Sequence, residues 1–258
     1  MLTFAAISIA RPGKRSVTPV YGRAAAAWLV DQSMYPNLEG EMNYLPAFVI
    51  LAWPLLLVPQ GIGEALWQIA QTSIFVWALW RLGRLHMPRD RNLILTITLL
   101  SLWIAFGSIK NGQTNLLMSA AMVHATVCYI EGKRNSVALW LGVALLAKPL
   151  AIVMWMLLIA TDRKMVVPLV AILLMVLALP FLMASPALAA QQYVDMWHQV
   201  VQLAPSQEHR FGDINALLRT LGLGIPLKAQ IILALVCAVG CLWFWAGSKT
   251  RLKEPYRG

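Results

Sequence analysis

Charged residues are scarce in this sequence. Asp, Glu, Lys and Arg make up only 12% of its 258 residues, whereas apolar residues make up 59%. In a soluble globular domain about a quarter of the residues are charged. The core of a soluble protein of this size could not bury so much apolar surface. The shortage of charge therefore argues against an ordinary soluble protein and predicts that lipid covers much of the chain.

Cysteine is also rare. The chain has three, Cys128, Cys237 and Cys241, and all of them fall inside apolar runs. Because no pair lies in a predicted loop outside the membrane, no disulfide framework is expected. Metal-ligating residues do not recur at ligand spacing, so neither a metal nor another cofactor is expected.

Acidic residues are outnumbered, with 11 Asp and Glu against 21 Lys and Arg. In a soluble protein such a surplus would point to nucleic acid, but here the basic residues gather in short gaps between apolar runs. The gaps expected on the cytoplasmic side are Arg81–Arg91, Glu131–Ser136, Thr161–Lys164 and the tail 248–258. We therefore expect no nucleic-acid partner and predict a multi-pass protein of the inner (plasma) membrane with a cytoplasmic C-terminus.

Long apolar runs, by contrast, are plentiful. A spanning helix needs about 20 mostly apolar residues, and the candidates are Ile62–Trp80, Asn92–Ser108, Thr114–Ile130, Met165–Ala189 and Pro226–Ala246. A further run, Val137–Ala160, is interrupted by Lys148 and Pro149 and has basic residues on both flanks. We expect it to enter the membrane and return as two short helices broken at this proline. The alternative is one kinked helix whose Lys148 reaches towards the interface.

Two stretches, 16–61 and 185–225, remain for the outer side. Thr18-Pro19 predicts an N-cap and a first-turn proline, and Ser185-Pro186 repeats the signal before an interfacial helix. Leu45–Val58 is too short and too rich in proline to span, so it is expected to lie along the membrane surface. The predicted fold is all-α, a polytopic membrane protein of about seven membrane segments with two extracytoplasmic helical loops. Residues 1–258 form a single membrane domain, with membrane helices in 62–184 and 226–247.

Four passages then resemble a known family in their order and spacing. They are VTPVYGRAAAAWLVDQSMYP (Val17–Pro36), NYLPAFVILAWPLLLVP followed by EALW (Asn43–Pro59, Glu64–Trp67), GQTNL (Gly112–Leu116) and GKRNSVALWLGVALLAKP (Gly132–Pro149). This succession resembles the integral-membrane glycosyltransferases of family 87, within the GT-C superfamily of enzymes that use polyprenyl-phosphate sugars. The resemblance extends from about Val17 to Trp245, and the chain looks shortened at both ends relative to the family.

The resemblance implies a GT-C-like fold and a reaction at the outer face of the inner membrane. A hexose, with mannose as one candidate, passes from a polyprenyl-phosphate donor to a lipid or glycan acceptor. The family's general base is expected just before the first-loop tyrosine, where this chain reads Thr18-Pro19-Val20-Tyr21 without an acid. For this reason a catalytically inactive membrane scaffold, or a component of a lipid or glycan transporter, stays open as an alternative.

The chemistry of hexosyl transfer needs a base, a cation for the leaving phosphate and polar groups for the sugar. For the base we predict Glu41 first and Asp31 second, although both are also ordinary solvated loop acids. For the phosphate we predict Lys148 with Arg210 as a helper, because a lysine among apolar residues is costly unless it is used. The predicted sugar-binding residues are Tyr44, Gln113, Asn115 and Asp213. Gln113 and Asn115 equally suit a structural lock at a helix start, and Asp213 suits a helix cap.

Overall fold

The computed structural model describes residues 16–35, 42–87 and 89–203, together with residues 9, 13, 226, 229, 232, 233, 235–237, 239 and 240. The chain divides into two compact units, Met1–Ala204 and Pro205–Gly258, and the first contains all the long described helices. Every regular element in the described residues is a helix and none is a strand. The all-α prediction is therefore confirmed for this part of the chain.

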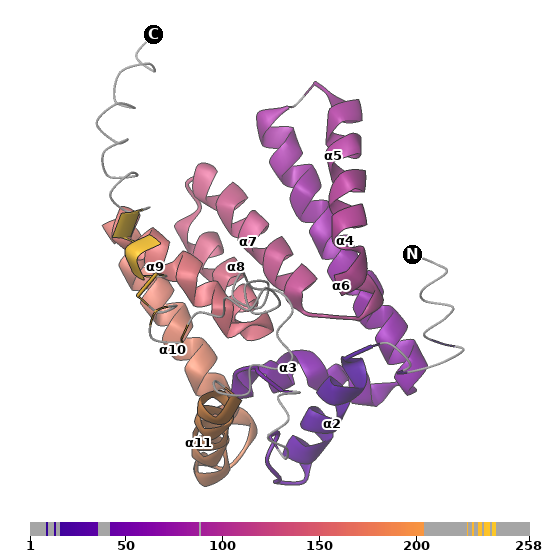
Figure 1. Ribbon diagram of the computed structural model, residues 1–258, viewed down its shortest axis with the longest axis vertical. Helices are drawn as coiled ribbons and strands as arrows, with labels where there is room; N and C mark the ends of the chain where they lie inside the picture. Colours follow the sequence, from indigo (N-terminus) through magenta and orange to yellow (C-terminus); the bar gives the residue numbers. More distant parts are fainter. Residues whose placement is uncertain are drawn as a thin grey trace. The chain divides into compact units, whose positions relative to one another are not determined.

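Four runs predicted to span the membrane are helical (Figure 1). They form α4 (Gln60–His86), α5 (Arg91–Ile104) with the short α6 (Phe106–Lys110), α7 (Asn115–Ile130) and α10 (Val166–Met183). Two predicted boundaries are wrong. α4 continues to His86, so Arg81 and Arg84 lie on a helix rather than in a loop. The predicted span Met165–Ala189 is divided at Ser185, where α10 has ended and the next helix begins. The span predicted at Pro226–Ala246 lies largely outside the described residues.

The run around Lys148 forms two helices, as predicted. α8 covers Arg134–Ala147, and after Lys148 a 3-10 turn (η3, Pro149–Ala151) leads into α9 (Ile152–Thr161). α9 folds back along α8, because Nε1–H of Trp155 donates to the carbonyl of Leu141 at 3.3 Å. The break at the Lys148-Pro149 step is confirmed, and the alternative of one kinked helix is wrong.

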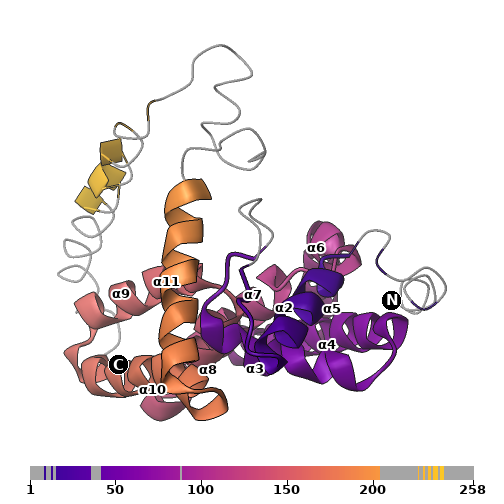
Figure 2. The ribbon, with the colours of Figure 1, turned by 90° about the horizontal axis from the view of Figure 1, so that it is seen from below.

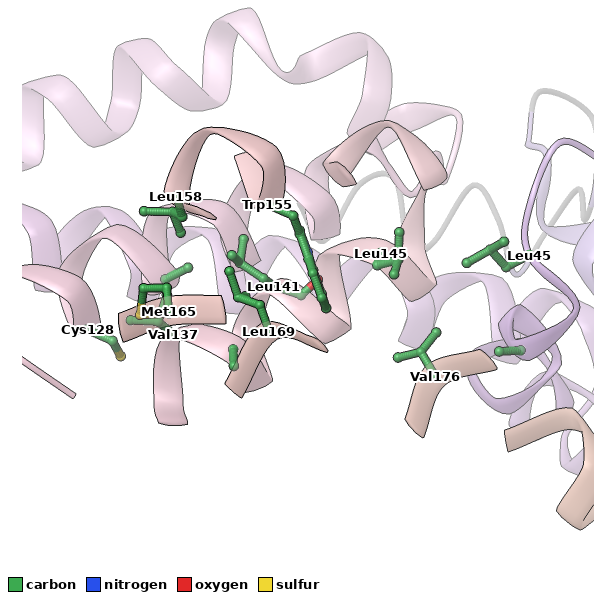
Figure 3. Packing of buried hydrophobic residues seen from close by; sticks show 13 residues of the cluster. Leu45, Cys128, Val137, Leu141, Leu145, Trp155, Leu158, Met165, Leu169 and Val176 are labelled. Carbon is green, nitrogen blue, oxygen red and sulfur yellow. The ribbon is translucent and has the colours of Figure 1, made fainter. Parts of the chain in front are cut away.

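The helices α8, α9 and α10 share one buried apolar cluster (Figure 3). Leu141, Trp155 and Leu169 are at most 1% exposed in it. Gly142 permits the close approach of α10 to α8, since a Cβ at this position would lie 2.6 Å from Cγ2 of Ile172. In lipid, where apolar burial gains little, such close contacts between small and large residues hold helices together.

The helices run between two ends of the first unit, which we call the loop end and the arginine end. At the loop end α4 and α7 begin and α8 and α10 stop; here Nε1–H of Trp67 donates to the carbonyl of Gly112 at 2.9 Å. At the arginine end α4 and α7 stop and α8 and α10 begin; here Arg81 pairs with Glu131 at 3.0 Å. Three of the stretches predicted to be cytoplasmic, 81–91, 131–136 and 161–164, thus lie at the arginine end, whereas the tail 248–258 lies outside the described residues.

Short helices cover the loop end. They are α2 (Thr18–Leu29), η1 (Pro46–Phe48), α3 (Val49–Ala52) and η2 (Trp53–Leu57). The prediction of Thr18 as N-cap is wrong: Thr18 lies inside the helix, and its own N–H donates to Oγ of Ser16 at 3.2 Å. α11 (Pro186–Leu203) begins as predicted, because Oγ of Ser185 accepts the N–H of Leu188 at 3.3 Å. Figure 2 shows the full length of α11.

One helical stretch of the described residues, Arg163–Met183, is long and apolar enough to cross a membrane by itself, with a mean hydropathy of 2.8. The other apolar helical stretches have 10–17 residues. α4 is long, but its buried Gln68, Gln71 and Thr72 give it a polar face. The total of about seven membrane segments, and the surface position of Leu45–Val58, stay predictions.

Candidate functional site

Tyrosines of α2 and of the segments that follow it form the buried centre of the loop end. The hydroxyl groups of Tyr21 and Tyr44 lie 2.8 Å apart, and Oγ1–H of Thr114 donates to the Tyr44 hydroxyl at 3.3 Å. The hydroxyl of Tyr35 donates to the carbonyl of Tyr44 at 2.8 Å. Burial raises the pKa of Tyr21 and of Tyr35 above the ordinary phenol value, so both stay neutral and act as hydrogen-bonding groups. Tyr44 is 7% exposed, and its predicted contact with a sugar stays a prediction.

The Gly-Gln-Thr-Asn turn joins this centre to the helices. Gly112 has a φ of +62°, and a Cβ there would lie 3.0 Å from neighbouring side chains, so the turn needs glycine for its conformation and its space. The N–H of Val17 donates to the carbonyl of Asn111 at 2.9 Å. Nδ2–H of Asn115 donates to Oε1 of Gln113 at 3.0 Å, and both side chains are half-buried. The turn thus locks the entry of α2 to the start of α7, while sugar binding by Gln113 and Asn115 stays a prediction.

The helix α11 holds the loop that follows α2 from the other side. The amide of Gln192 accepts the N–H of Met34 at 3.0 Å and donates to the carbonyl of Gln32 at 2.9 Å. Two helical turns further along α11, Nε2–H of Gln199 donates to the carbonyl of Met42 at 2.8 Å. Both glutamines are at most 2% exposed. The predicted interfacial helix is therefore also a positioning element for the first loop.

A pocket of about 450 Å³ opens between α2, η2 and the first turns of α4. Its polar lining residues are Arg23, Glu64, Thr18 and Gln60. Glu64 is 4% exposed, and the N–H of Gly13 donates to its Oε2 at 3.1 Å. Small-molecule sites have volumes of about 300–1,000 Å³ and a few polar groups on mostly apolar walls. The pocket has both features, with leucines and a valine completing its walls.

The sequence predicts no catalytic role for Glu64, because this residue stands at the start of a run that predicts a spanning helix. The signal that points to it is its isolation. It is the one acid within α4, and a carboxylate in a membrane helix is costly unless it is partnered or functional. That Glu64 and Arg23 line one pocket needed the fold, since Arg23 lies 41 positions earlier in the chain.

The residues predicted for catalysis lie apart from this pocket where the structure describes them. Asp31 is exposed, follows the end of α2 and has a φ of +58°. Lys148 is half-buried at the junction of α8 and η3, and it forms no ion pair with any described residue. Neither side chain lines the pocket that contains Glu64. Glu41, Arg210 and Asp213 lie outside the described residues, so their roles stay predictions.

Comparison with known proteins gives one match. A sequence model of glycosyltransferase family 87 matches residues 43–255. The match contains the passages at Asn43–Pro59, Gly112–Leu116 and Gly132–Pro149, whereas Val17–Pro36 precedes it. No curated protein and no solved structure was found to match the chain.

Proposed function

Because the chain belongs to glycosyltransferase family 87, we propose that it transfers a hexose from a polyprenyl-phosphate-hexose to a hydroxyl group of a lipid or glycan acceptor. The polyprenyl tail of the donor dissolves in the bilayer, so its sugar lies at the membrane interface. We place the reaction at the loop end, on the outer face of the inner membrane, with mannose as the first hexose to test. No metal or other cofactor is assigned to the reaction.

The transfer needs one proton acceptor and one stabilised leaving group. A carboxylate takes the proton of the acceptor hydroxyl while the hydroxyl oxygen bonds to the anomeric carbon of the hexose. The bond between this carbon and the phosphate oxygen breaks, and the electron pair leaves with the polyprenyl phosphate. A nearby cation stabilises the negative charge that develops on that phosphate.

The observation that carries the proposal beyond the family is the pocket that Glu64 and Arg23 share. A buried carboxylate in the same pocket as a hydroxyl-bearing residue and an amide-bearing residue is suited to receive a proton from a bound alcohol. Arg23 brings a permanent positive charge to the same pocket, which suits an anionic phosphate. Glu64 therefore joins Glu41 and Asp31 as a candidate base, and Arg23 joins Lys148 and Arg210 as a candidate phosphate ligand.

A set of matched variants distinguishes the candidate bases. The full chain is reconstituted in liposomes with radiolabelled polyprenyl-phosphate-hexoses and a membrane lipid extract, and labelled product is counted for wild type, Glu64→Gln, Glu41→Gln and Asp31→Asn. Loss of the true base is expected to slow transfer by about 10²- to 10⁴-fold. Glu131→Gln at the arginine end makes the same chemical change away from the pocket and is expected to leave the rate unchanged.

The outcomes separate the roles. A lower transfer rate in Glu64→Gln, with an unchanged rate in Glu131→Gln, supports Glu64 as the base. A wild-type rate in Glu64→Gln indicates that Glu41 or Asp31 is the base. Lys148→Ala and Arg23→Gln test the phosphate ligands in the same assay, with a loss of about 10²- to 10³-fold expected for the residue that faces the phosphate. Absence of transfer with every donor would contradict the proposal and favour the inactive scaffold or the transporter component.

A further inference from the structure

A groove separate from the pocket of Glu64 lies between α4 and α5 near the arginine end. Its volume is about 460 Å³. Its lining consists of Val76, Trp80 and Arg84 on α4 and Arg91, Ile94, Leu95 and Thr98 on α5. A second hollow of about 490 Å³ shares Val76 and Trp80 with it and continues along α4 past Trp77, Ser73 and Thr72. We call the two hollows together the α4–α5 groove; both helices lie side by side in Figures 1 and 2.

The groove changes character along its length. Two arginines, Arg84 and Arg91, stand at one end, and both are exposed. The guanidinium carbon of Arg84 lies 5.5 Å from the ring centroid of Trp80, a cation–π contact that holds the charge at the rim. Beyond them the lining is mostly aliphatic and aromatic, with Thr98 on α5 and with Thr72 and Ser73 at the far end. One end is thus suited to an anion and the rest to a hydrocarbon chain.

The positive charge of this rim is not cancelled by the described residues around it. Neither Arg84 nor Arg91 forms an ion pair within the described part of the chain. The nearest acid in sequence, Asp90, does not line the groove, and its Oδ1 accepts the N–H of Leu93 at 2.8 Å as the N-cap of α5. The arginines are therefore available to an anion from outside the chain.

The walls of the groove are held at a fixed separation. Gly83 on α4 lets Ile94 of α5 approach so closely that a Cβ at Gly83 would lie 2.8 Å from Cγ1 of Ile94. Since the side chain of Ile94 packs directly on the backbone of Gly83, the two helices are in contact before any ligand binds. A preformed site loses little free energy in ordering when it binds.

The arginine rim of the groove lies far from the candidate active site. Glu64 and Arg84 are 20 positions apart on the same helix, which corresponds to about 30 Å, the thickness of the hydrocarbon layer. A head group bound between Arg84 and Arg91 is therefore distinct from the head group of a donor or acceptor at the loop end.

We propose that the α4–α5 groove binds an anionic phospholipid of the surrounding bilayer. The phosphate lies between Arg84 and Arg91, and one acyl chain follows Val76 and Leu95 towards Thr72. Basic pockets between membrane helices are suited to anionic head groups, because the positive charge attracts them and the bilayer presents them at high local concentration. A net negative head group distinguishes this ligand from a zwitterionic phospholipid, whose own cation opposes the arginines.

The test measures lipid binding by the full chain, purified in a neutral detergent and depleted of lipid. Native mass spectrometry counts adducts of phosphatidylglycerol and of phosphatidylcholine on wild type, on Arg84→Gln/Arg91→Gln and on Arg163→Gln/Lys164→Gln. The second pair is exposed, lies at the same end of the unit and removes the same charge without touching the groove. Wild type and the Arg163/Lys164 variant are expected to prefer phosphatidylglycerol, and the Arg84/Arg91 variant to bind it about 30-fold more weakly.

A further variant and a further ligand complete the test. Val76→Trp fills the apolar part of the groove while both arginines remain, and it is also expected to lose phosphatidylglycerol. Equal binding of phosphatidylglycerol by wild type and by Arg84→Gln/Arg91→Gln, or equal binding of the two lipids by wild type, would overturn the proposal. Inorganic phosphate that displaces the lipid at equal concentration would also overturn it, since the site would then recognise a free anion.

Discussion

At the scale of single residues, the hydroxyl group of Tyr44 joins three segments that are far apart in sequence. It lies 2.8 Å from the Tyr21 hydroxyl on α2 and accepts from Thr114 before α7. A buried hydroxyl that satisfies two partners contributes most through the cost of leaving those partners unpaired. Its role in the fold is therefore visible from geometry alone, whatever its part in binding a sugar.

The first prediction follows from that geometry. Tyr44→Phe keeps the ring but leaves the Tyr21 and Thr114 hydroxyls without this partner, so the free energy of unfolding is expected to fall by about 1–3 kcal/mol. A thermal unfolding scan of the purified protein in detergent measures the effect. Tyr129→Phe is the matched control, because Tyr129 is 39% exposed and its hydroxyl bonds Asp162 rather than this network. Equal unfolding temperatures for Tyr44→Phe and wild type would show that the network carries no stability.

Glu131 gives a prediction for pH. Its carboxylate accepts from Nζ of Lys133 at 2.8 Å and from Arg81 at 3.0 Å, and these bonds hold its pKa below the ordinary value of 4.5. A carboxyl whose pKa is lowered by folding stabilises the fold above the ordinary pKa, and that stabilisation is lost as pH falls through the lowered value. Wild type is therefore expected to unfold at a higher temperature than Glu131→Gln at neutral pH. The difference is expected to shrink as pH falls below the ordinary pKa of 4.5 and to vanish once the carboxyl is protonated in the folded protein. A difference that persists at the lowest pH would contradict the assignment.

At this same scale the sequence predicted some features and missed others. The break at Lys148 and Pro149 was predictable, because proline removes a helical hydrogen bond whatever its surroundings. The burial of Glu64 was not, since the bond from Gly13 and the pocket shared with Arg23 form only in the fold. Loop position and residue type favour Asp31 and Glu41 as bases, but these two properties do not determine whether a carboxylate lines a cavity.

At the scale of elements, α11 binds the first loop through glutamines spaced along one face. Gln192 pairs with the backbone of Gln32 and Met34, and Gln199 with that of Met42. Gln192→Leu leaves an N–H and a carbonyl of the loop unpaired, so a loss of stability of about 1–3 kcal/mol is expected. Gln191→Leu, on the exposed side of the same helix, is expected to change stability by less than about 0.5 kcal/mol. Chemical denaturation measures the free energy of unfolding of both variants. Equal values for Gln192→Leu and Gln191→Leu would show that α11 does not stabilise the first loop.

The return of the chain through α8 and α9 gives a prediction for membrane sidedness. Cysteines are introduced singly at Val30, Asn135 and Lys164, with Cys128, Cys237 and Cys241 replaced by alanine. Asn135→Cys and Lys164→Cys flank the hairpin and are expected to react with a membrane-impermeant maleimide from one side, and Val30→Cys from the other. Reaction of Asn135→Cys and Lys164→Cys from opposite sides would show that the segment crosses the membrane once.

Element boundaries were predicted less well than element types. Apolar runs identified α4, α5, α7 and α10 as helices, because apolar length is a property of the sequence itself. The end of α4 was missed, since arginines on the last turns of a helix look like loop residues when only charge is considered. The start of α2 was missed by one residue: Val17 is the N-cap and has no capping side chain, while Oγ of Ser16 accepts the N–H of Thr18.

At the scale of the whole first unit, the two ends differ in chemistry. The loop end has neutral hydrogen-bonding networks and the pocket of Glu64, whereas the arginine end has the Arg81–Glu131 pair and the rim of the α4–α5 groove. Such a division suits a transferase whose reacting groups lie at one membrane interface while the other end fixes the protein in the bilayer.

Hexosyl transfer yields two products in equal amounts, and measuring both tests directly whether the chain catalyses it. The wild-type chain in liposomes is supplied with a polyprenyl-phosphate-hexose labelled in the sugar and, separately, in the polyprenyl tail. Each labelled hexose that appears on an acceptor is expected to be matched by one released polyprenyl phosphate, and both products are expected to fall together in Glu64→Gln. Movement of intact donor between leaflets, with neither product formed, would contradict hexosyl transfer and identify the chain as part of a lipid transporter.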